Sequence, residues 1–231
     1  AGTRLPVTAA EQWILSRLAA TLVEVEAQFK TYRFDLVAQA LYEFVWNDYC
    51  DWFLELSKPA LNGDDSQAIA STKHTLLRVL EAILRALHPI TPFITEEIWQ
   101  NVAPRLGIAG ESVSARPYPR GDEFSPGIES GSVADIEWLK SVLGEVRGIR
   151  SEMNISPGKQ IPLLFAKGST ADLSGLQRLR SQITFLARTE SQRWLTDGDE
   201  EPACASAIIG DLRVLIPLAG LIDLDAEKAR L

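Results

Sequence analysis

The stretch from Leu41 to Pro59, LYEFVWNDYCDWFLELSKP, concentrates aromatic side chains that could stack on nucleic-acid bases. It carries six rings within one predicted helix: Tyr42, Phe44, Trp46, Tyr49, Trp52 and Phe53. The i, i+4, i+7, i+11 spacing of Tyr42, Trp46, Tyr49 and Phe53 predicts that these four line one helical face. Such rings serve either as the core of a large bundle or as platforms for unpaired bases. Asn47, on a polar stripe of the same helix, could offer both a donor and an acceptor to a base edge.

Arginines are placed where they could meet phosphate groups. Arg33 lies just before a predicted helix start, between Tyr32 and Phe34. A guanidinium, two rings and a helix N-terminus could hold a phosphate and stack a base. The same residues also fit an arginine that shields the end of a bundle through an ion pair. Arg147 and Arg150 lie one turn apart on a later predicted helix, where they could follow a phosphate backbone or form a solvated face.

The residue types of a catalytic centre do not form a convincing set. The two histidines, His74 and His88, fall on or just after one predicted helix, and His88 precedes a proline, where a capping role suffices. No serine lies in a nucleophile-elbow pattern. Pro157-Gly158-Lys159 resembles part of a phosphate loop, but it precedes a predicted strand and lacks the leading glycine. The sequence therefore favours surface recognition over catalysis.

Size and charge narrow the class of protein. The chain has 231 residues and a formal net charge of −8, which argues against a protein that simply coats phosphates. One region departs from this balance, because the stretch from Lys140 to Arg193 contains nine basic residues and only four acidic ones. A nucleic-acid partner is therefore compatible with the sequence if it meets a local surface.

Cysteine usage and hydropathy bear on location. Cys50 and Cys204 match no metal-ligand spacing, and free thiols in a reducing compartment favour the cytosol. No run reaches the roughly 18 uncharged apolar residues of a membrane helix, and no secretory signal opens the chain. We expect no membrane partner and a monomer. The first residue is Ala1, and the final DLDAEKARL resembles the opening of a helix, so we expect a piece of a longer chain.

The first half of the sequence predicts an antiparallel helical bundle. Thr8 and Glu11 form a capping-box pattern, Pro59 and His88-Pro89 predict helix ends, and Thr91-Pro92 predicts a start. Short connections between the helices are typical of a bundle. The predicted helices run from about Thr8 to Lys30, Leu36 to Ser57, Gln67 to Leu87 and Thr91 to Val102.

The second half predicts a small α+β domain. The Gly-, Pro- and Ser-rich stretch from Pro104 to Gly131 predicts a domain boundary near Asp122. Gly210-Asp211 predicts a tight hairpin turn. The predicted elements are a helix to about Glu152, a strand at Ile161–Phe165, a helix at about Ala171–Ala187, and strands near Gln192–Leu195, Ala203–Ile209 and Leu212–Ile216. The fold class is thus mainly α, with a bundle over residues 1–121 and an α+β domain over 122–222.

These residues resemble the C-terminal region of bacterial valyl-tRNA synthetases, over nearly the whole chain and in the family's order. The run with Trp46, Cys50-Asp51-Trp52 and Lys58 is highly specific, whereas the HPITPFITEEIW run also resembles synthetases for leucine and isoleucine. The matching runs are YRFDLVAQALYEFVWNDYCDWFLELSKP, LHPITPFITEEIWQ, RPYP, VRGIRSEMNISPGKQIPL and VLIPLAGLIDLDAE.

The resemblance implies a helical anticodon-binding domain, a small α/β module, and a coiled-coil arm that begins at residues 223–231. It implies that the partner is valine tRNA. The family's earlier bundle helix, its catalytic HIGH-like and KMSKS-like motifs and its editing domain have no counterpart here. The fragment is therefore expected to be non-catalytic and without a cofactor, while the parent ligase uses ATP and Mg²⁺.

We expect the tRNA contacts to come from rings, an amide and basic side chains in both halves. Stacking contributes about 1–3 kcal/mol per base, so one or two rings with a few polar contacts could select an anticodon. The candidate residues are Arg33, Phe34, Phe44, Trp46, Asn47, Trp52 and Lys58 for the anticodon, and Arg147, Arg150 and Lys159 for the backbone. Two alternatives remain open at this point: the same domain of an isoleucyl- or leucyl-type synthetase, and a helical scaffold that binds no RNA.

Overall fold

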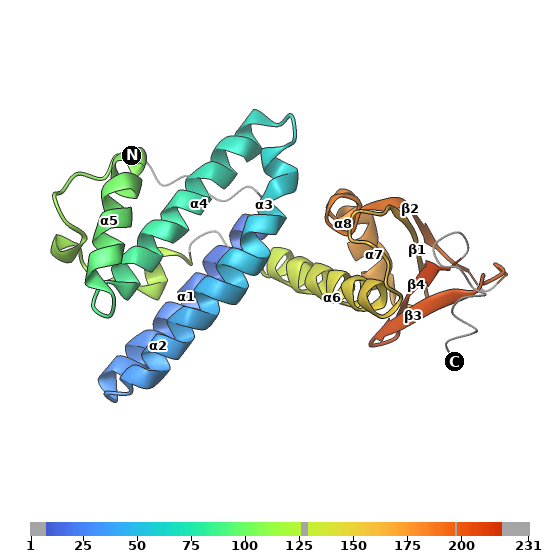
Figure 1. The fold of residues 1–231 in the computed structure, drawn as a ribbon, viewed down its shortest axis with the longest axis horizontal. Coiled ribbons are helices and arrows are strands. Elements are labelled where there is room, and N and C mark those ends of the chain that lie inside the picture. The colour runs from blue at the N-terminus through green and yellow to red at the C-terminus, as the bar shows by residue number, and fades with distance from the viewer. Residues whose placement is uncertain (1–7, 126–128, 197, 219–231) are drawn as a thin grey trace. The chain divides into compact units, whose positions relative to one another are not determined.

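The computed structural model describes residues 8–125, 129–196 and 198–218. The chain divides into two compact units, Ala1–Val133 and Ala134–Leu231, which we call unit 1 and unit 2 (Figure 1). The division falls within the first turns of α6 rather than near Asp122. Residues 223–231, where the coiled-coil arm was expected, lie outside the described residues.

Unit 1 is a helical bundle. Helix α1 packs against α2, against the π-helical segment that follows α2, and against α4, and α4 in turn packs against α3 and α5. The elements are α1 (Ala9–Lys30), α2 (Phe34–Glu43), the π-helical segment (Phe44–Phe53), α3 (Leu54–Leu61), α4 (Ser66–Leu87) and α5 (Pro92–Val102). Short 3-10 turns follow at Ala103–Leu106, Val113–Ala115 and Gly121–Glu123. The predicted bundle is confirmed.

Capping residues fix where the helices of unit 1 begin. The Thr8 hydroxyl accepts from the Glu11 backbone N–H at 3.2 Å, and Asp65 Oδ1 accepts from the N–H of Gln67 at 2.8 Å. Pro92 occupies the first turn of α5, where its missing N–H costs nothing. The second helix differs from the prediction at its end: it passes Pro59 and stops at Leu61. Proline removes one intrahelical donor there, and only two residues follow it in the helix.

The second helix also departs from regular α geometry. Residues Phe44–Phe53 form a π-helical segment between α2 and α3. The i→i+5 bonding of a π-helix shifts the face on which later residues fall. The expectation that four rings share one face is therefore wrong: Tyr49 and Phe53 are buried, while Tyr42 and Trp46 are exposed.

The segment after α5 is fastened to α4, which explains why unit 1 extends beyond residue 121. Buried Arg85 forms an ion pair with Glu81 and a hydrogen bond of 3.1 Å to the Pro117 carbonyl. The Arg78 guanidinium lies 5.0 Å from the ring centre of Phe124. These contacts hold the last 3-10 turn and Phe124 in unit 1, despite the loop-like composition of the sequence.

Unit 2 contains a four-stranded sheet with the order β2-β1-β4-β3. Strands β1 and β2 are parallel, and β4 is antiparallel to both β1 and β3. The elements are α6 (Ser130–Glu152), β1 (Ile161–Ala166), α7 (Thr170–Arg178), α8 (Arg180–Ala187), β2 (Thr189–Trp194), β3 (Cys204–Ile209) and β4 (Leu212–Pro217). The helix expected over 171–187 is interrupted at Leu179. Ile209 pairs with Leu212, and Gly210 has a φ of 58°, so the predicted Gly210-Asp211 hairpin is present.

In unit 2, Trp138 of α6 contacts α7. The Trp138 indole N–H donates to Asp172 Oδ1 at 2.8 Å, and Gly175 allows α7 to approach the ring. The Arg178–Asp135 ion pair, 2.6 Å long, joins α7 to α6 as well. No helix among the described residues is both long and apolar enough to cross a membrane.

Candidate nucleic-acid interface

An exposed pair of stacked rings lies on the outer side of the second helix. Tyr42 and Trp46 are 64% and 56% exposed. Their ring planes differ by 2° and their centroids are 6.3 Å apart. Asn47, the next residue, is also exposed. We call Tyr42, Trp46 and Asn47 the ring face, because it offers an aromatic platform beside an amide.

The other rings of the same stretch build the bundle. Phe44 and Phe53 are fully buried, and the Tyr49 hydroxyl donates to the Leu76 carbonyl at 3.1 Å. Burial, with a smaller effect of Cys50, raises the pKa of Tyr49 to about 12. Phe44 was a candidate contact residue, but only 2% of it is exposed. Its ring is packed in the core, so it has no face to offer a base.

A second group of exposed rings surrounds the turn between α1 and α2. Tyr32 is 79% exposed with a φ of 57°, and Phe34 is 57% exposed. The ring of Phe34 makes edge contacts with those of Tyr32 and Phe29. Left-handed geometry at Tyr32 lets the chain reverse tightly and leaves both rings outside.

Arg33, which lies between Tyr32 and Phe34 in the sequence, forms an ion pair with Asp35 in the first turn of α2. Its Nε and Nη2 donate to the two carboxylate oxygens of Asp35 at 2.9 and 2.7 Å. The hydrogen bond from Arg33 lowers the pKa of Asp35 to about 2. The ion pair foreseen as one alternative is thus present. The pair is exposed, and exposed ion pairs contribute little to stability.

A small polar pocket of about 110 Å³ lies between α1 and the second helix, beside Asn47. Arg17 on α1 forms an ion pair of 2.9 Å with the buried carboxylate of Asp48. The lining of this pocket includes Arg17, Thr21, Glu24, Glu43, Asn47 and Asp48. Carboxylate and amide oxygens suit the amino groups of bases rather than phosphates. Sequence reasoning missed Arg17, because its partner is 31 residues away and no local pattern marks it.

Two further candidates lie near the end of the second helix. Trp52 is half-buried, so only part of its ring is accessible. Lys58 is exposed and forms an ion pair of 2.5 Å with Glu55. Both residues follow the ring face in the sequence, Trp52 in the π-helical segment and Lys58 in α3.

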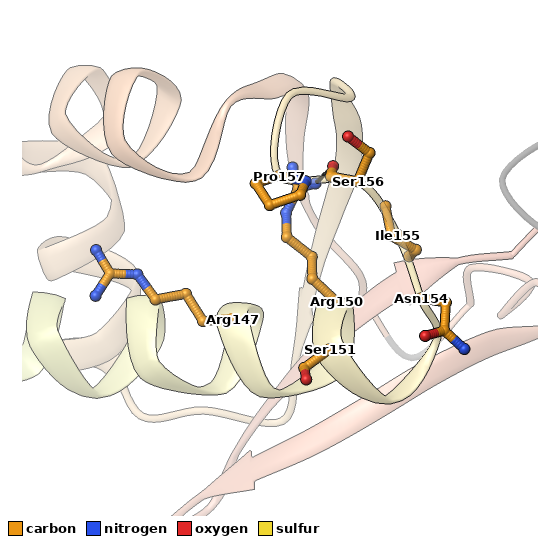
Figure 2. A pocket seen from close by; sticks show the side chains of 7 residues that line it. All are labelled: Arg147, Arg150, Ser151, Asn154, Ile155, Ser156 and Pro157. Carbon is orange, nitrogen blue, oxygen red and sulfur yellow. Dashed lines mark hydrogen bonds between the residues drawn. The ribbon is translucent and has the colours of Figure 1, made fainter.

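In unit 2, a pocket of about 440 Å³ lies at the C-terminal end of α6 (Figure 2). We call it the α6-end pocket. Figure 2 shows Arg150 extending from α6 toward Ser156 and Pro157, with Arg147 one turn earlier. Its lining residues are Arg147, Arg150, Ser151, Asn154, Ile155, Ser156 and Pro157.

Arg150 has a structural task that argues against its expected contact with phosphate. It is 7% exposed, and its guanidinium donates to the carbonyls of Ser156, Lys159 and Ala187 at 2.8–2.9 Å. Burial, followed by the charge of Arg188, lowers the pKa of Arg150. Arg147 and Lys159, the other two candidates, have exposed side chains.

The described residues offer no metal centre: no group of three or more His, Cys, Asp or Glu side chains among them could hold an ion. His88 Nδ1 lies 2.9 Å from the Thr95 hydroxyl, which fits the predicted role at a helix end. Cys50 and Cys204 are free thiols, as expected.

Comparison with known proteins places these surfaces in context. Residues 11–165 match the model of the family described as anticodon-binding domain of tRNA ligase. The chain is 54% identical over 230 residues to the valine–tRNA ligase of Stenotrophomonas maltophilia (strain R551-3) and 53% identical over 231 residues to that of Xanthomonas campestris pv. campestris (strain B100). These alignments cover 100% of the chain and 24% of each relative. The chain thus spans about a quarter of the length of these relatives.

Proposed function

Since the chain belongs to the family of anticodon-binding domains of tRNA ligases, we propose that it recognises the anticodon stem-loop of valine tRNA as one part of a longer valine–tRNA ligase. The whole-chain identity of 51–54% to ligases named for valine supports valine over isoleucine or leucine. ATP and Mg²⁺ would act in the remaining part of that enzyme. We further propose a monomeric, cytosolic protein.

The observation that carries the proposal is the exposed ring face, which begins with Tyr42 in α2 and continues with Trp46 and Asn47 in the π-helical segment. Single-stranded RNA loops are read by stacking of their bases on aromatic rings and by hydrogen bonds to base edges. Tyr42 and Trp46 provide the platform, and Asn47 the amide beside it. A helix that exposes a tryptophan loses the favourable free energy of burying that side chain, which suggests that the exposed ring serves a function. π-Helical turns are also frequent at functional sites.

The other accessible candidates form two groups around the ring face. Arg33 and Phe34, at the α1–α2 turn, offer a cation and a ring to the loop backbone and a neighbouring base. Trp52 and Lys58 follow the ring face toward the C-terminal end of the second helix. The polar pocket with Arg17 and Asn47 would receive base amino groups, because its carboxylates repel phosphate.

Binding of the 231-residue chain to the valine and isoleucine anticodon stem-loops, over a series of salt concentrations, tests the proposal. We expect tighter binding to the valine loop at every salt concentration and a loss of about 5- to 150-fold for Trp46→Ala. Phe185→Ala, which removes an exposed ring from α8, is the matched control and should change neither affinity. Equal affinities for both loops, or unchanged binding by Trp46→Ala, would contradict the proposal.

A further inference from the structure

We propose that an exposed apolar face of α5 docks against the part of the longer ligase that lies outside these 231 residues. We call Ile90, Phe93, Ile94, Glu97 and Ile98 the α5 face. The occupant is taken from the proposed function, which makes the chain one part of a valine–tRNA ligase. Unit 1 then has two separate contact surfaces, the ring face for RNA and the α5 face for protein.

The α5 face concentrates apolar side chains that are open to solvent. Phe93 is 90% exposed, Ile94 57%, Ile90 44% and Ile98 37%. Four of the twelve large apolar side chains that are exposed among the described residues therefore lie within residues 90–98. Single exposed apolar residues are ordinary on protein surfaces, whereas a group of neighbouring ones marks a contact surface.

Helix α5 cannot turn this face inward, because its other side is already packed. Trp99 is 1% exposed and belongs to the same core cluster as Leu84 of α4. The carboxylate of Glu96 accepts from the Ser112 hydroxyl at 2.8 Å and from the Val113 backbone N–H at 3.1 Å. Helix α5 thus lies fixed between α4 and the 3-10 turns that follow it in unit 1 (Figure 1). The α5 face is left without a partner in the bundle.

The charge of the α5 face indicates the chemistry of its occupant. Glu97 is exposed among the apolar residues and forms no ion pair within the described part of the chain. The face contains no basic residue, so it does not suit the phosphates of RNA. A two-fold contact between copies would bring together two acidic faces of a chain with a net charge of −8. The fitting occupant is an apolar protein surface with a basic residue opposite Glu97.

Such a surface is available in the same polypeptide. The chain covers 24% of the valine–tRNA ligases that it matches, so most of such a ligase lies outside these residues. Helix α5 belongs to the part of the chain, residues 11–165, that matches the anticodon-binding family. A tethered partner has a high effective concentration, so a few apolar side chains are enough to hold two domains together.

Thiol labelling measures whether the α5 face is covered. The labelling rate of Phe93→Cys is compared in the 231-residue chain and in the full-length ligase that contains it, with mass spectrometry of the labelled peptide. A docked state favoured by about tenfold leaves about a tenth of the molecules open, so labelling at position 93 should slow by about tenfold in the ligase. Tyr42→Cys is the control, because Tyr42 is an exposed ring of unit 1 that the proposed function leaves open, and its rate should stay unchanged.

Photo-cross-linking identifies what covers the face. Benzoylphenylalanine in place of Phe93 is irradiated in the full-length ligase without RNA. We expect cross-links to residues of the same ligase molecule that lie outside these 231. Ile94→Glu should remove those cross-links by placing a charge in the apolar contact, whereas Ile94→Val, the matched control, should retain them. Ile94 is exposed in unit 1, so neither variant should change the unfolding of the 231-residue chain.

Equal labelling of position 93 in the two proteins would overturn the docking of α5 and leave anticodon recognition standing. Cross-links confined to these 231 residues would show that the chain covers its own face, and cross-links between two ligase molecules would assign the face to a second copy. Slower labelling only after addition of the valine stem-loop would assign the face to RNA. Each of these three results would overturn the proposal as well.

Failure of anticodon recognition shows in a different measurement. The affinity of the 231-residue chain for the valine and isoleucine stem-loops depends on the ring face, and Ile94→Glu should leave both affinities unchanged. Equal affinities for the two stem-loops, together with slow labelling and outside cross-links at position 93, would therefore contradict anticodon recognition and retain the docking of α5.

Discussion

The rings of Tyr42 and Trp46 lie parallel on the outside of the second helix, with 2° between their planes and 6.3 Å between their centroids. A centroid distance of this size corresponds to an offset stack, so part of each ring face stays open. Tyr42 lies in α2, and Trp46, four residues later, lies in the π-helical segment, in which Tyr49 and Phe53 are buried. Because the two rings support one another, they are expected to act as a single platform.

The platform predicts non-additive losses of RNA binding. Tyr42→Ala and Trp46→Ala should each weaken binding of the valine stem-loop by about 1–3 kcal/mol, and the double variant by less than the sum. Both rings are exposed, so the free energy of unfolding should change by only about 0.5 kcal/mol. A double-mutant cycle by anisotropy, with urea unfolding of each variant, measures both quantities. Strictly additive losses would mean that the rings contact separate bases.

Arg150 is predicted to be far more important for stability than Arg147. Arg150→Ala leaves three carbonyls without their charged donor, which should cost about 3 kcal/mol or more in the unfolding of unit 2. Arg150→Lys should restore only part of this, because an ammonium group cannot reproduce the planar fork. Urea unfolding followed by hydrogen exchange in β1 measures the loss. Arg147→Gln is the control and should stay within about 0.5 kcal/mol; equal losses for the two arginines would refute the assigned roles.

The Arg33–Asp35 pair predicts a carboxyl that titrates at unusually low pH. Its pKa is lowered from 3.8 to about 2, so the ionised pair stabilises the fold above the ordinary pKa and is lost as the pH falls through about 2. Carbon-detected NMR of Asp35 should give this midpoint, and Arg33→Gln should raise it toward 3.8. If RNA phosphate takes over Arg33, bound RNA should raise the Asp35 pKa as well. If Arg33→Gln leaves the titration midpoint of Asp35 unchanged, the ion pair does not persist in solution.

The approach of the 3-10 turn Gly121–Glu123 to α1 predicts intolerance to a side chain. A Cβ at Gly121 would lie 2.7 Å from the Ala19 carbonyl oxygen and 2.9 Å from Val23 Cγ2. Gly121→Ala should therefore destabilise unit 1 by about 1–3 kcal/mol. Gly144 in α6 is a suitable control, because a Cβ there meets no atom within 4 Å, and Gly144→Ala should stabilise by about 0.5–1 kcal/mol. Thermal unfolding of both variants decides the point; a neutral Gly121→Ala would show that the turn can move away from α1.

Much of the secondary structure was predictable because its signals are local. Thr8 and Asp65 mark helix starts through hydrogen bonds within one turn, Pro92 suits the first turn of α5 because it has no N–H, and Gly210-Asp211 fixes a hairpin by its own backbone preference. The boundary of the units was not predictable in this way. Gly- and Pro-rich composition suggested a linker near Asp122, whereas Arg78 and Arg85, distant in sequence, hold that segment to α4.

The sequence by itself determined the helical bundle, the α+β unit and the family, because periodicity, turn residues and specific runs such as the one around Trp46 are written along the chain. Only the tertiary structure decided which candidates face solvent. Within the π-helical segment Phe44–Phe53, Phe44, Tyr49 and Phe53 are buried in the bundle, whereas Trp46 is exposed, as is Tyr42 in α2. Likewise, Arg17 and Arg150 form hydrogen bonds with partners that lie 31 and up to 37 residues away in the sequence. Contacts of that range depend on how helices and strands pack, which a linear pattern of residues does not encode.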